Sequence, residues 1–274
     1  MQMNPSTAPL ISIVTINRNN ADNLYRTLSN TSTQQEAEYE QIVVDGASTD
    51  GSVDVVRDPA LRVDRWISEP DSGVYEAQNK GLRLARGRFV LFMNSGDHFL
   101  NNQSLAMATA RLDEADLQSF DIVVRGYQRL HGGQDFVKCA PDTPTFSYFA
   151  RDTLPHQSTF IRRDLFERYG EYDTSLKIVA DWKAFLLWIC RHNCSYRHHP
   201  LPLSVFYGDG LSSRPENEEI HRAERRQVLE QEFAAFLADV DELTEGRRAL
   251  KQIDTLRGSR VVRALQGVGL LWKF

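Results

Sequence analysis

The stretch SEPDSGVYEAQNKGLRLARGRFVLFMNSGD, residues 68–97, places a helix and a strand in close succession. Apolar residues recur at helical spacing in VYEAQNKGLRLA, residues 74–85, and Gly87 follows as a helix terminator. The run RFVLFMN, residues 88–94, has the continuous apolar centre of a buried strand and then stops at Asn-Ser-Gly-Asp. A helix that leads directly into a buried strand predicts part of a βαβ unit.

The same alternation extends on both sides of this stretch. Apolar runs predict strands at residues 10–16, 40–45, 62–68, 88–94 and 120–126. Helix-period segments separate them, the first starting at Asn20 or Asp22 as an N-cap and another covering residues 102–115. This pattern predicts an α/β domain built on a mainly parallel sheet. The second half is less regular, with a helix over residues 179–192, a strand-like segment over residues 196–210 and a charged helix after about residue 215.

The composition limits the class of protein. The chain has 274 residues, of which 41% are hydrophobic, enough for one large domain with an appendage. Its longest apolar runs fall well short of the roughly 20 residues of a membrane-spanning helix. A net charge of −5 argues against nucleic-acid binding, which relies on neutralising phosphates. The N-terminus MQMNPSTAPL does not resemble a signal peptide, and an odd number of cysteines predicts reduced thiols, so we expect a cytoplasmic protein.

Polar side chains follow the predicted strands where each one ends, namely Asn17, Asp45, Glu69, Asp71, Asn94 and Asp97. Ligands of open parallel sheets bind at this edge, because helix N-termini and loops converge there. Asp45 is either a turn or helix cap, or a carboxylate that accepts from a base N–H or a ribose hydroxyl. Asp97 is either a cap of the next helix, or a ligand of Mg²⁺ or Mn²⁺ bridged to a diphosphate.

Two residues of the second half have the same ambiguity. Asp181 lies near the start of an apolar helix, where an N-cap is the default role, but it could serve as general base for an acceptor hydroxyl. His156 is either structural, or a donor to a phosphate, or a metal ligand. His198 and His199 have no third ligand at metal spacing and are expected on a strand surface.

Four motifs in order resemble one family over about residues 9–212. PLISIVTINRN, IVVDGASTDGS, the opening stretch and VADWKAFLLW are similar to the inverting GT-A glycosyltransferases of family two. The likeness is greatest to the bacterial branch that builds capsule, exopolysaccharide and lipopolysaccharide. The resemblance implies a GT-A fold, a mainly parallel Rossmann-like sheet flanked by helices, over residues 1–215. A helical, basic, amphipathic C-terminal extension would then cover residues 216–274.

The resemblance also implies roles for individual residues. Asp45 would address the nucleotide base, Asp97 would be the last carboxylate of the metal-binding D-x-D, and Asp181 would be the catalytic base. The donor site would further include Thr15, Asn17, Asp71, Asn79, Lys80, Asn94 and Ser95. Ser95 stands where the family has its first acid, so the Mn²⁺ or Mg²⁺ would depend more on the diphosphate.

The implied reaction moves a sugar from a nucleotide-diphosphate sugar, a UDP-sugar being favoured, to a hydroxyl of a saccharide or lipid-linked acceptor with inversion. The alternative is a non-catalytic nucleotide-sugar-binding scaffold. A nicotinamide-dependent dehydrogenase is set aside, because NRNNADN after the first strand lacks the G-x-G-x-x-G motif. A nucleotidyltransferase is set aside because no glycine- and lysine-rich phosphate loop follows that strand.

The C-terminal tail GSRVVRALQGVGLLWKF lies outside these motifs. Apolar residues at helical spacing would give a helix in this tail one apolar stripe, made of Val261, Leu265, Val268 and Trp272. From residue 246 onward seven Lys or Arg face one Asp. The tail therefore predicts either a helix docked on the chain or on a second copy, or a peripheral anchor on the anionic inner face of the cytoplasmic membrane.

Overall fold

The computed structural model describes residues 8–126, 134–207, 210, 214–259 and 262. The chain divides into two compact units, Met1–Arg225 and Arg226–Phe274. The domain boundary at residue 215 that the sequence suggests stays a prediction. The apolar stripe predicted for the tail, made of Val261, Leu265, Val268 and Trp272, lies outside the described residues.

The first unit alternates strands and helices through its first half. In chain order the elements of the first half are β1 (Ile11–Asn17), α1 (Ala21–Ser32), β2 (Tyr39–Asp45), α2 (Ser52–Val56), β3 (Arg65–Ser68), α3 (Val74–Leu84), β4 (Phe89–Phe92), β5 (His98–Phe99), α4 (Ser104–Thr109) and β6 (Leu117–Arg125). There follow β7 (Phe136–Lys138), α6 (Phe146–Phe149), the 3-10 turn η1 (His156–Ser158), β8 (Thr159–Arg162), α7 (Asp164–Tyr169), α8 (Ala180–Leu186), the π-helical η2 (Leu187–Arg191) and β9 (Tyr196–Tyr207). The chain continues with the 3-10 turn η4 (Pro215–Asn217), α9 (Glu218–Glu232), the 3-10 turn η5 (Ala234–Phe236) and α10 (Leu237–Gly258).

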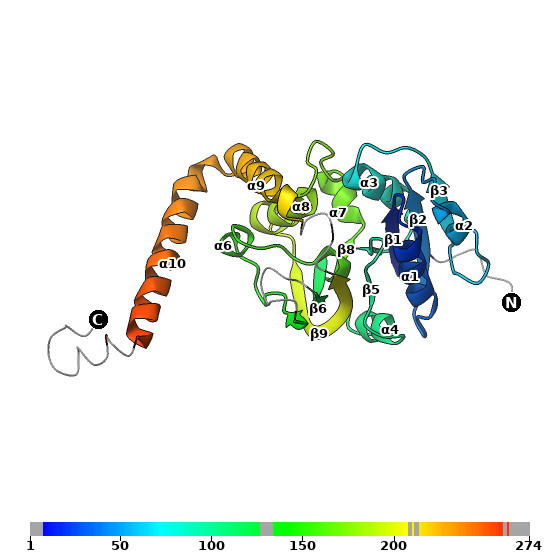
Figure 1. Cartoon of the computed structure of the whole chain (residues 1–274), viewed down its shortest axis with the longest axis horizontal. Coiled ribbons are helices and arrows are strands. Elements are labelled where there is room, and N and C mark those ends of the chain that lie inside the picture. The colour runs from blue at the N-terminus through cyan, green and yellow to red at the C-terminus, as the bar shows by residue number, and fades with distance from the viewer. Residues whose placement is uncertain (1–7, 127–133, 208–209, 211–213, 260–261, 263–274) are drawn as a thin grey trace. The chain divides into compact units, whose positions relative to one another are not determined.

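The strands form one mixed sheet in the order β3-β2-β1-β4-β8-β6-β9-β5, and β7 pairs with β6 (Figure 1). The pairs β3–β2, β2–β1, β1–β4 and β6–β9 are parallel, whereas β8, β5 and β7 pair antiparallel to their neighbours. The predicted α/β architecture with a mainly parallel sheet is confirmed. All five strands predicted in the first half are present, with shifted ends.

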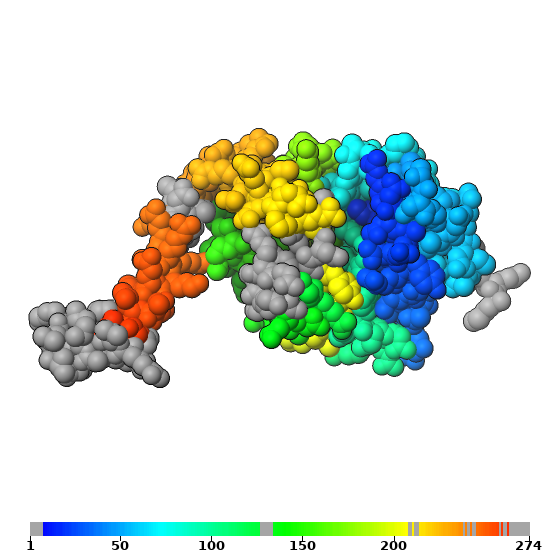
Figure 2. All heavy atoms as spheres, in the orientation of Figure 1, coloured from blue at the N-terminus to red at the C-terminus, as the bar shows by residue number. Residues whose placement is uncertain are grey.

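Helices cover both faces of the parallel part of the sheet. Leu24 and Leu28 of α1 pack in one cluster with Val43 of β2, and Figure 2 shows α1, in dark blue, on the outer surface. On the opposite face α3 lies so close that a side-chain Cβ at Gly81 would be 2.3 Å from Val14 Cγ1 of β1. Side chains alternate between the faces along a strand, so Val14 and Val43 mark opposite sides.

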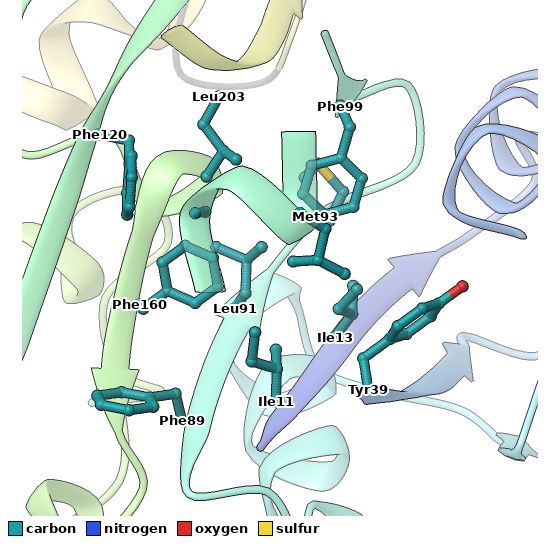
Figure 3. Packing of buried hydrophobic residues seen from close by; sticks show 12 residues of the cluster. Ile11, Ile13, Tyr39, Phe89, Leu91, Met93, Phe99, Phe120, Phe160 and Leu203 are labelled. Carbon is teal, nitrogen blue, oxygen red and sulfur yellow. The ribbon is translucent and has the colours of Figure 1, made fainter. Parts of the chain in front are cut away.

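A core cluster of buried residues lies on one face of the sheet (Figure 3). Ile13 of β1 and Leu91 of β4 occupy paired positions in neighbouring strands, and both are fully buried. Phe120 of β6 and Phe160 of β8 meet edge to face, with ring centroids 5.6 Å apart. This apolar layer joins the parallel strands to the antiparallel ones, and it holds the ends of β1 and β4 in place beneath the candidate site.

Two expectations from the sequence are wrong, namely the length of one helix and the exposure of one histidine. The helix predicted over residues 102–115 is limited to α4, because the Gln118 side chain accepts from Asp113 N and donates to Asp113 O and Ala115 O, which fixes a turn there. His198 is on a strand, but its side chain is only 7% exposed and lies between Asp121 and Asp142. The three cysteines, all among the described residues, form no disulfide, as predicted.

Candidate active site

The ends of the first three strands of the sheet converge at its carboxyl edge. Asn17 of β1, Asp45 of β2 and Ser68 of β3 occupy one register row across the parallel strands. Asn17 and Asp45 are buried, and Asn17 Nδ2 donates to Asp45 Oδ1 over 3.1 Å. The sequence argument from strand ends therefore brings these two residues together correctly.

Asp45 accepts hydrogen bonds on both of its oxygens. Oδ1 accepts from Asn17 and from the Ser48 hydroxyl, while Oδ2 accepts from Ser48 N over 2.9 Å and from the Ser68 hydroxyl over 2.7 Å. Burial raises the pKa of Asp45, but these hydrogen bonds outweigh it and hold the pKa below its ordinary value. The carboxylate is therefore ionised at neutral pH, and its neighbours are locked around it.

Ser95 connects the end of β4 to the end of β1. Its hydroxyl lies 2.9 Å from Ile16 O and from Asn17 Oδ1 and can donate to either, and its amide donates to Ile16 O over 3.2 Å. The residue at the first acidic position of the expected D-x-D is therefore bonded to the neighbouring strand β1. Ser95 joins the Asn17–Asp45 group through this contact.

Asn94 begins a second chain of hydrogen bonds that reaches Asp181. Gln78 Nε2 donates to Asn94 Oδ1, Asn94 Nδ2 lies 3.2 Å from His156 Nε2, and His156 Nδ1 lies 3.2 Å from Asp181 Oδ2. An amide N–H facing Nε2 requires a lone pair there, so the proton of a neutral His156 ring is on Nδ1 and points at Asp181. Residues far apart in the sequence thus meet beside the end of β4.

The other oxygen of Asp181 is held by its own helix and by α3. Asp181 Oδ1 accepts from Trp182 N over 2.9 Å, and the Tyr75 hydroxyl lies 2.8 Å from it. The same hydroxyl lies 2.6 Å from Ile178 O, so it can donate to either acceptor. The Asp181 side chain is 14% exposed, which leaves this fixed carboxylate open to a small ligand group.

Asp181 and His156 shift each other's protonation. Burial raises the pKa of Asp181, but the hydrogen bond and the charge of His156, with the bond from Tyr75, outweigh it and lower the pKa. Burial lowers the pKa of His156, while Asp181 and the charge of Asp97 raise it above its ordinary value. The arrangement therefore keeps Asp181 as a carboxylate and makes His156 a ready donor to it.

Asp97 lies near this second chain. It is 8% exposed, Asp97 N donates to Asn94 O over 3.0 Å, and Asp97 O accepts from the Thr27 hydroxyl over 2.8 Å. Across the described ranges, no group of three His, Cys, Asp or Glu side chains could hold a metal ion. A single carboxylate fits Mg²⁺ or Mn²⁺ only where substrate phosphates and water complete the coordination.

Two of the sequence-predicted donor residues are occupied inside the fold. Thr15 is fully buried and accepts from Gln41 Nε2 over 2.9 Å. Asn79 is 2% exposed, and its amide bonds the backbone of Tyr172 in both directions, over 2.9 and 3.0 Å. Neither side chain takes part in the two hydrogen-bond chains described above.

Of the remaining two, Asp71 lies just before α3 and Lys80 lies within it. Asp71 Oδ1 accepts from Gly73 N, and Oδ2 would be 2.5 Å from a side-chain Cβ at Gly46. The residue after Asp45 must therefore be glycine for Asp71 to come this close. Lys80 pairs with Glu69 over 2.9 Å and donates to Pro70 O over 2.6 Å, which ties down the same loop.

Sequence reasoning missed Tyr75, Ser48, Ser68 and Gln78, which hold the residues described above. Ser48 and Ser68 could have been found, since they lie next to Asp45 in a turn and at the end of a predicted strand. Tyr75 gave no such signal, because its partner Asp181 is 106 positions away along the chain.

The mixed sheet, with helices on both faces of its parallel strands, has the α/β fold of the GT-A class. The profile described as "Glycosyl transferase family 2" matches residues 12–169, and the chain belongs to this family. A PGL/p-HBAD biosynthesis glycosyltransferase of Mycobacterium bovis (strain BCG / Pasteur 1173P2) is 32% identical over 181 residues, which cover 64% of this chain and 68% of the relative.

Two solved structures have the same fold. S. aureus TarS 1-349 in complex with UDP-GlcNAc superposes with a TM-score of 0.60 at 19% identity, covering 80% of this chain and 66% of that one. Mannosyltransferase PcManGT from Pyrobaculum calidifontis, in complex with GDP-Man and Mn²⁺, has a TM-score of 0.57 at 18% identity, covering 98% and 88%. In the part of the chain that the structure describes, no helix is long and apolar enough to cross a membrane.

Proposed function

We propose that this chain transfers a sugar from a nucleotide-diphosphate sugar to a hydroxyl of a saccharide or lipid-linked acceptor, with inversion at the anomeric carbon. The observation that carries this proposal is the Asp181 carboxylate, fixed on Oδ1 by Trp182 N and Tyr75 and faced on Oδ2 by His156. Membership of glycosyl transferase family 2 supports a nucleotide sugar as donor. The mycobacterial relative supports a role in bacterial surface glycan synthesis.

The donor nucleotide would bind at the ends of β1 and β2. All acceptor positions of Asp45 are filled by protein donors, so a base N–H or ribose hydroxyl would replace a serine hydroxyl there. Ser48 and Ser68 can rotate their hydroxyls toward the nucleotide in exchange. A UDP-sugar is the favoured donor, in line with the UDP-GlcNAc bound by the structurally similar TarS.

Asp181 would act as general base. The acceptor O–H would give its proton to Oδ2, the oxygen with fewer protein donors, while the acceptor oxygen attacks the anomeric carbon. The bond from that carbon to the diphosphate breaks, and its electron pair leaves with the nucleoside diphosphate. Attack from the face opposite the leaving group inverts the carbon, so a covalent enzyme intermediate is unnecessary.

Asp97 would hold a divalent cation, Mn²⁺ or Mg²⁺, together with diphosphate oxygens and water. When bound, such an ion supplies positive charge where the leaving diphosphate becomes negative. Asn94 and Ser95 would then shape the pocket beneath the diphosphate, since their side chains fix the end of β4 to His156 and to Asn17.

The test is release of nucleoside diphosphate from a panel of nucleotide sugars, with Mn²⁺ and with and without sugar acceptors. Asp181→Asn should lower turnover by about 10² to 10⁴-fold while the nucleotide Kd stays near that of the wild type. Asp173→Asn is the matched control, because Asp173 pairs with Lys183 of α8 outside the hydrogen-bond chains. Nucleotide binding without turnover in the wild type would indicate the scaffold alternative.

For the tail, we propose peripheral binding to the anionic inner face of the cytoplasmic membrane, which would confine the enzyme to the plane of a lipid-linked acceptor. Each Lys or Arg near an anionic surface adds about 1 kcal/mol. Liposomes with anionic lipid should pellet the full chain, and salt should release it, whereas a chain ending at Glu245 should stay in the supernatant. Equal pelleting of both chains would favour docking on protein, and a concentration-dependent dimer would identify a second copy as partner.

A further inference from the structure

We propose that Glu224 of α9 is a positioning residue for Asp181, an inference that rests on the proposed function. Glu224 is 9% exposed, although it belongs to a charged helix that the sequence assigns to the C-terminal extension. A carboxylate in this environment needs donors, since burying an unpaired charge is costly. Its donors are on the segment that leads into the helix of Asp181.

Both oxygens of Glu224 bind the backbone just before α8. Glu224 Oε1 accepts from Lys177 N over 2.6 Å, and Oε2 accepts from Ile178 N over 3.0 Å. The N-cap of α8 is Val179, whose side chain makes no capping hydrogen bond. Glu224 therefore supplies from another helix the anchoring that the local sequence does not provide.

The anchored peptide connects directly to the proposed base. Ile178 O lies 2.6 Å from the Tyr75 hydroxyl, which in turn lies 2.8 Å from Asp181 Oδ1. If residues 177–178 move, Tyr75 loses one acceptor and turns its proton fully toward Asp181, and the start of α8 shifts. Either change alters the direction and the basicity of the carboxylate.

Arg225 restrains the same helix from the other side. Its guanidinium lies 4.4 Å from the centroid of the Trp182 ring, and Nη2 donates over 2.7 Å to Phe149 O and to Asp152 O. Trp182 Nε1 donates to Phe149 O as well, over 2.8 Å. The residue next to Asp181 is thus clamped, so adjacent residues of α9 hold the base from two directions.

The experiment is a double-mutant cycle with Glu224→Gln and Tyr75→Phe. An amide can accept on only one atom, so Glu224→Gln keeps the shape but loses one backbone bond and the charge. We expect kcat to fall by about tenfold or more, because small misplacement of a catalytic group is costly, while the nucleotide Kd changes less than about twofold. In the Tyr75→Phe background, Glu224→Gln should lower kcat by a clearly smaller factor.

Glu219→Gln on the exposed side of α9 is the matched control and should retain wild-type kcat. A wild-type kcat in Glu224→Gln, or equal fold losses with and without Tyr75, would overturn the inference while Asp181→Asn still supports the reaction. If Glu224→Gln does not fold, Glu224→Asp replaces it, because it keeps the charge on a side chain too short to reach Lys177 N and Ile178 N in the same way, and the same loss of kcat is expected. A wild-type chain that turns over no nucleotide sugar would overturn the proposed function and this inference together.

Discussion

Asp45→Ala tests whether the stability of the carboxyl edge of the sheet depends on one buried carboxylate. The substitution removes the acceptor of Ser48 N, Asn17 Nδ2 and two serine hydroxyls. The serine hydroxyls can turn to other acceptors, whereas Ser48 N and Asn17 Nδ2 lose the carboxylate that accepts from them. At about 1–3 kcal/mol for each of the two donors, we expect a loss of about 2–6 kcal/mol in the free energy of unfolding. That corresponds to a fall in Tm of roughly 4–24 °C for a chain of this size.

Thermal and urea unfolding at neutral pH measure this loss, and Asp54→Ala on the exposed side of α2 is the control, expected within about 0.5 kcal/mol of wild type. The lowered pKa of Asp45 gives a second check. The contribution of ionised Asp45 to the free energy of unfolding is complete above the ordinary Asp pKa of about 3.9. It disappears as the pH falls through the lower pKa of the folded state, so the stabilities of the variant and the wild type should converge in acid. A variant as stable as wild type at pH 7 would refute the reasoning. Where the variant is folded, its nucleotide Kd should rise more than its kcat falls.

Three further substitutions test other parts of the molecule. Gly87→Ala should destabilise by about 1–3 kcal/mol in urea, because its Cβ would lie 2.5 Å from Ser12 N, a backbone atom that cannot rotate away; an unchanged midpoint would disprove this packing. His156→Leu should move the acidic limb of the kcat profile to higher pH, because burial then raises the pKa of Asp181 without the offset from His156; an unmoved limb would show that the pair is not coupled. Asp97→Ala should lower turnover by about 100-fold or more and weaken its dependence on Mn²⁺, and turnover within about tenfold of wild type with the same dependence would exclude Asp97 as ligand.

The parallel half of the fold could be predicted because three of its four strands, β1, β2 and β4, are buried on both faces. Continuous apolar runs such as that of β4 have few alternative structures, and their order along the chain limits the topology. Since the carboxyl ends of these strands share one edge, the contact between Asn17 and Asp45 also follows from the sequence. The length of α4 does not, since it is set by the side chain of Gln118, which a helix-period pattern cannot reveal.

At the site, the direction of side chains on helices was the main feature that the sequence could not predict. Asn79 and Gln78 are neighbours on α3, yet Asn79 bonds the backbone of Tyr172 while Gln78 points to Asn94. Which of them faces the ligand edge depends on the rotation of α3 about its axis, and that rotation is fixed by the close packing of Gly81 on Val14. The family resemblance placed α3 in the site, but the neighbours of each side chain come only from tertiary packing.

The end of β4 explains why a buried strand stops at Asn-Ser-Gly-Asp. Successive side chains point in different directions, so Ser95 reaches Asn17 on the side of the nucleotide strands, while Asn94 reaches His156 on the side of the proposed base. Gly96, with a φ of 105°, then turns the chain in a conformation that other residues rarely adopt, and Asp97 follows in the position proposed for the cation. Neutral side chains suit both contacts, because a carboxylate at Ser95 would face Asn17 Oδ1 and Ile16 O, both of which are acceptors. The missing first acid of the D-x-D is therefore consistent with its surroundings, and it concentrates the proposed metal binding on Asp97.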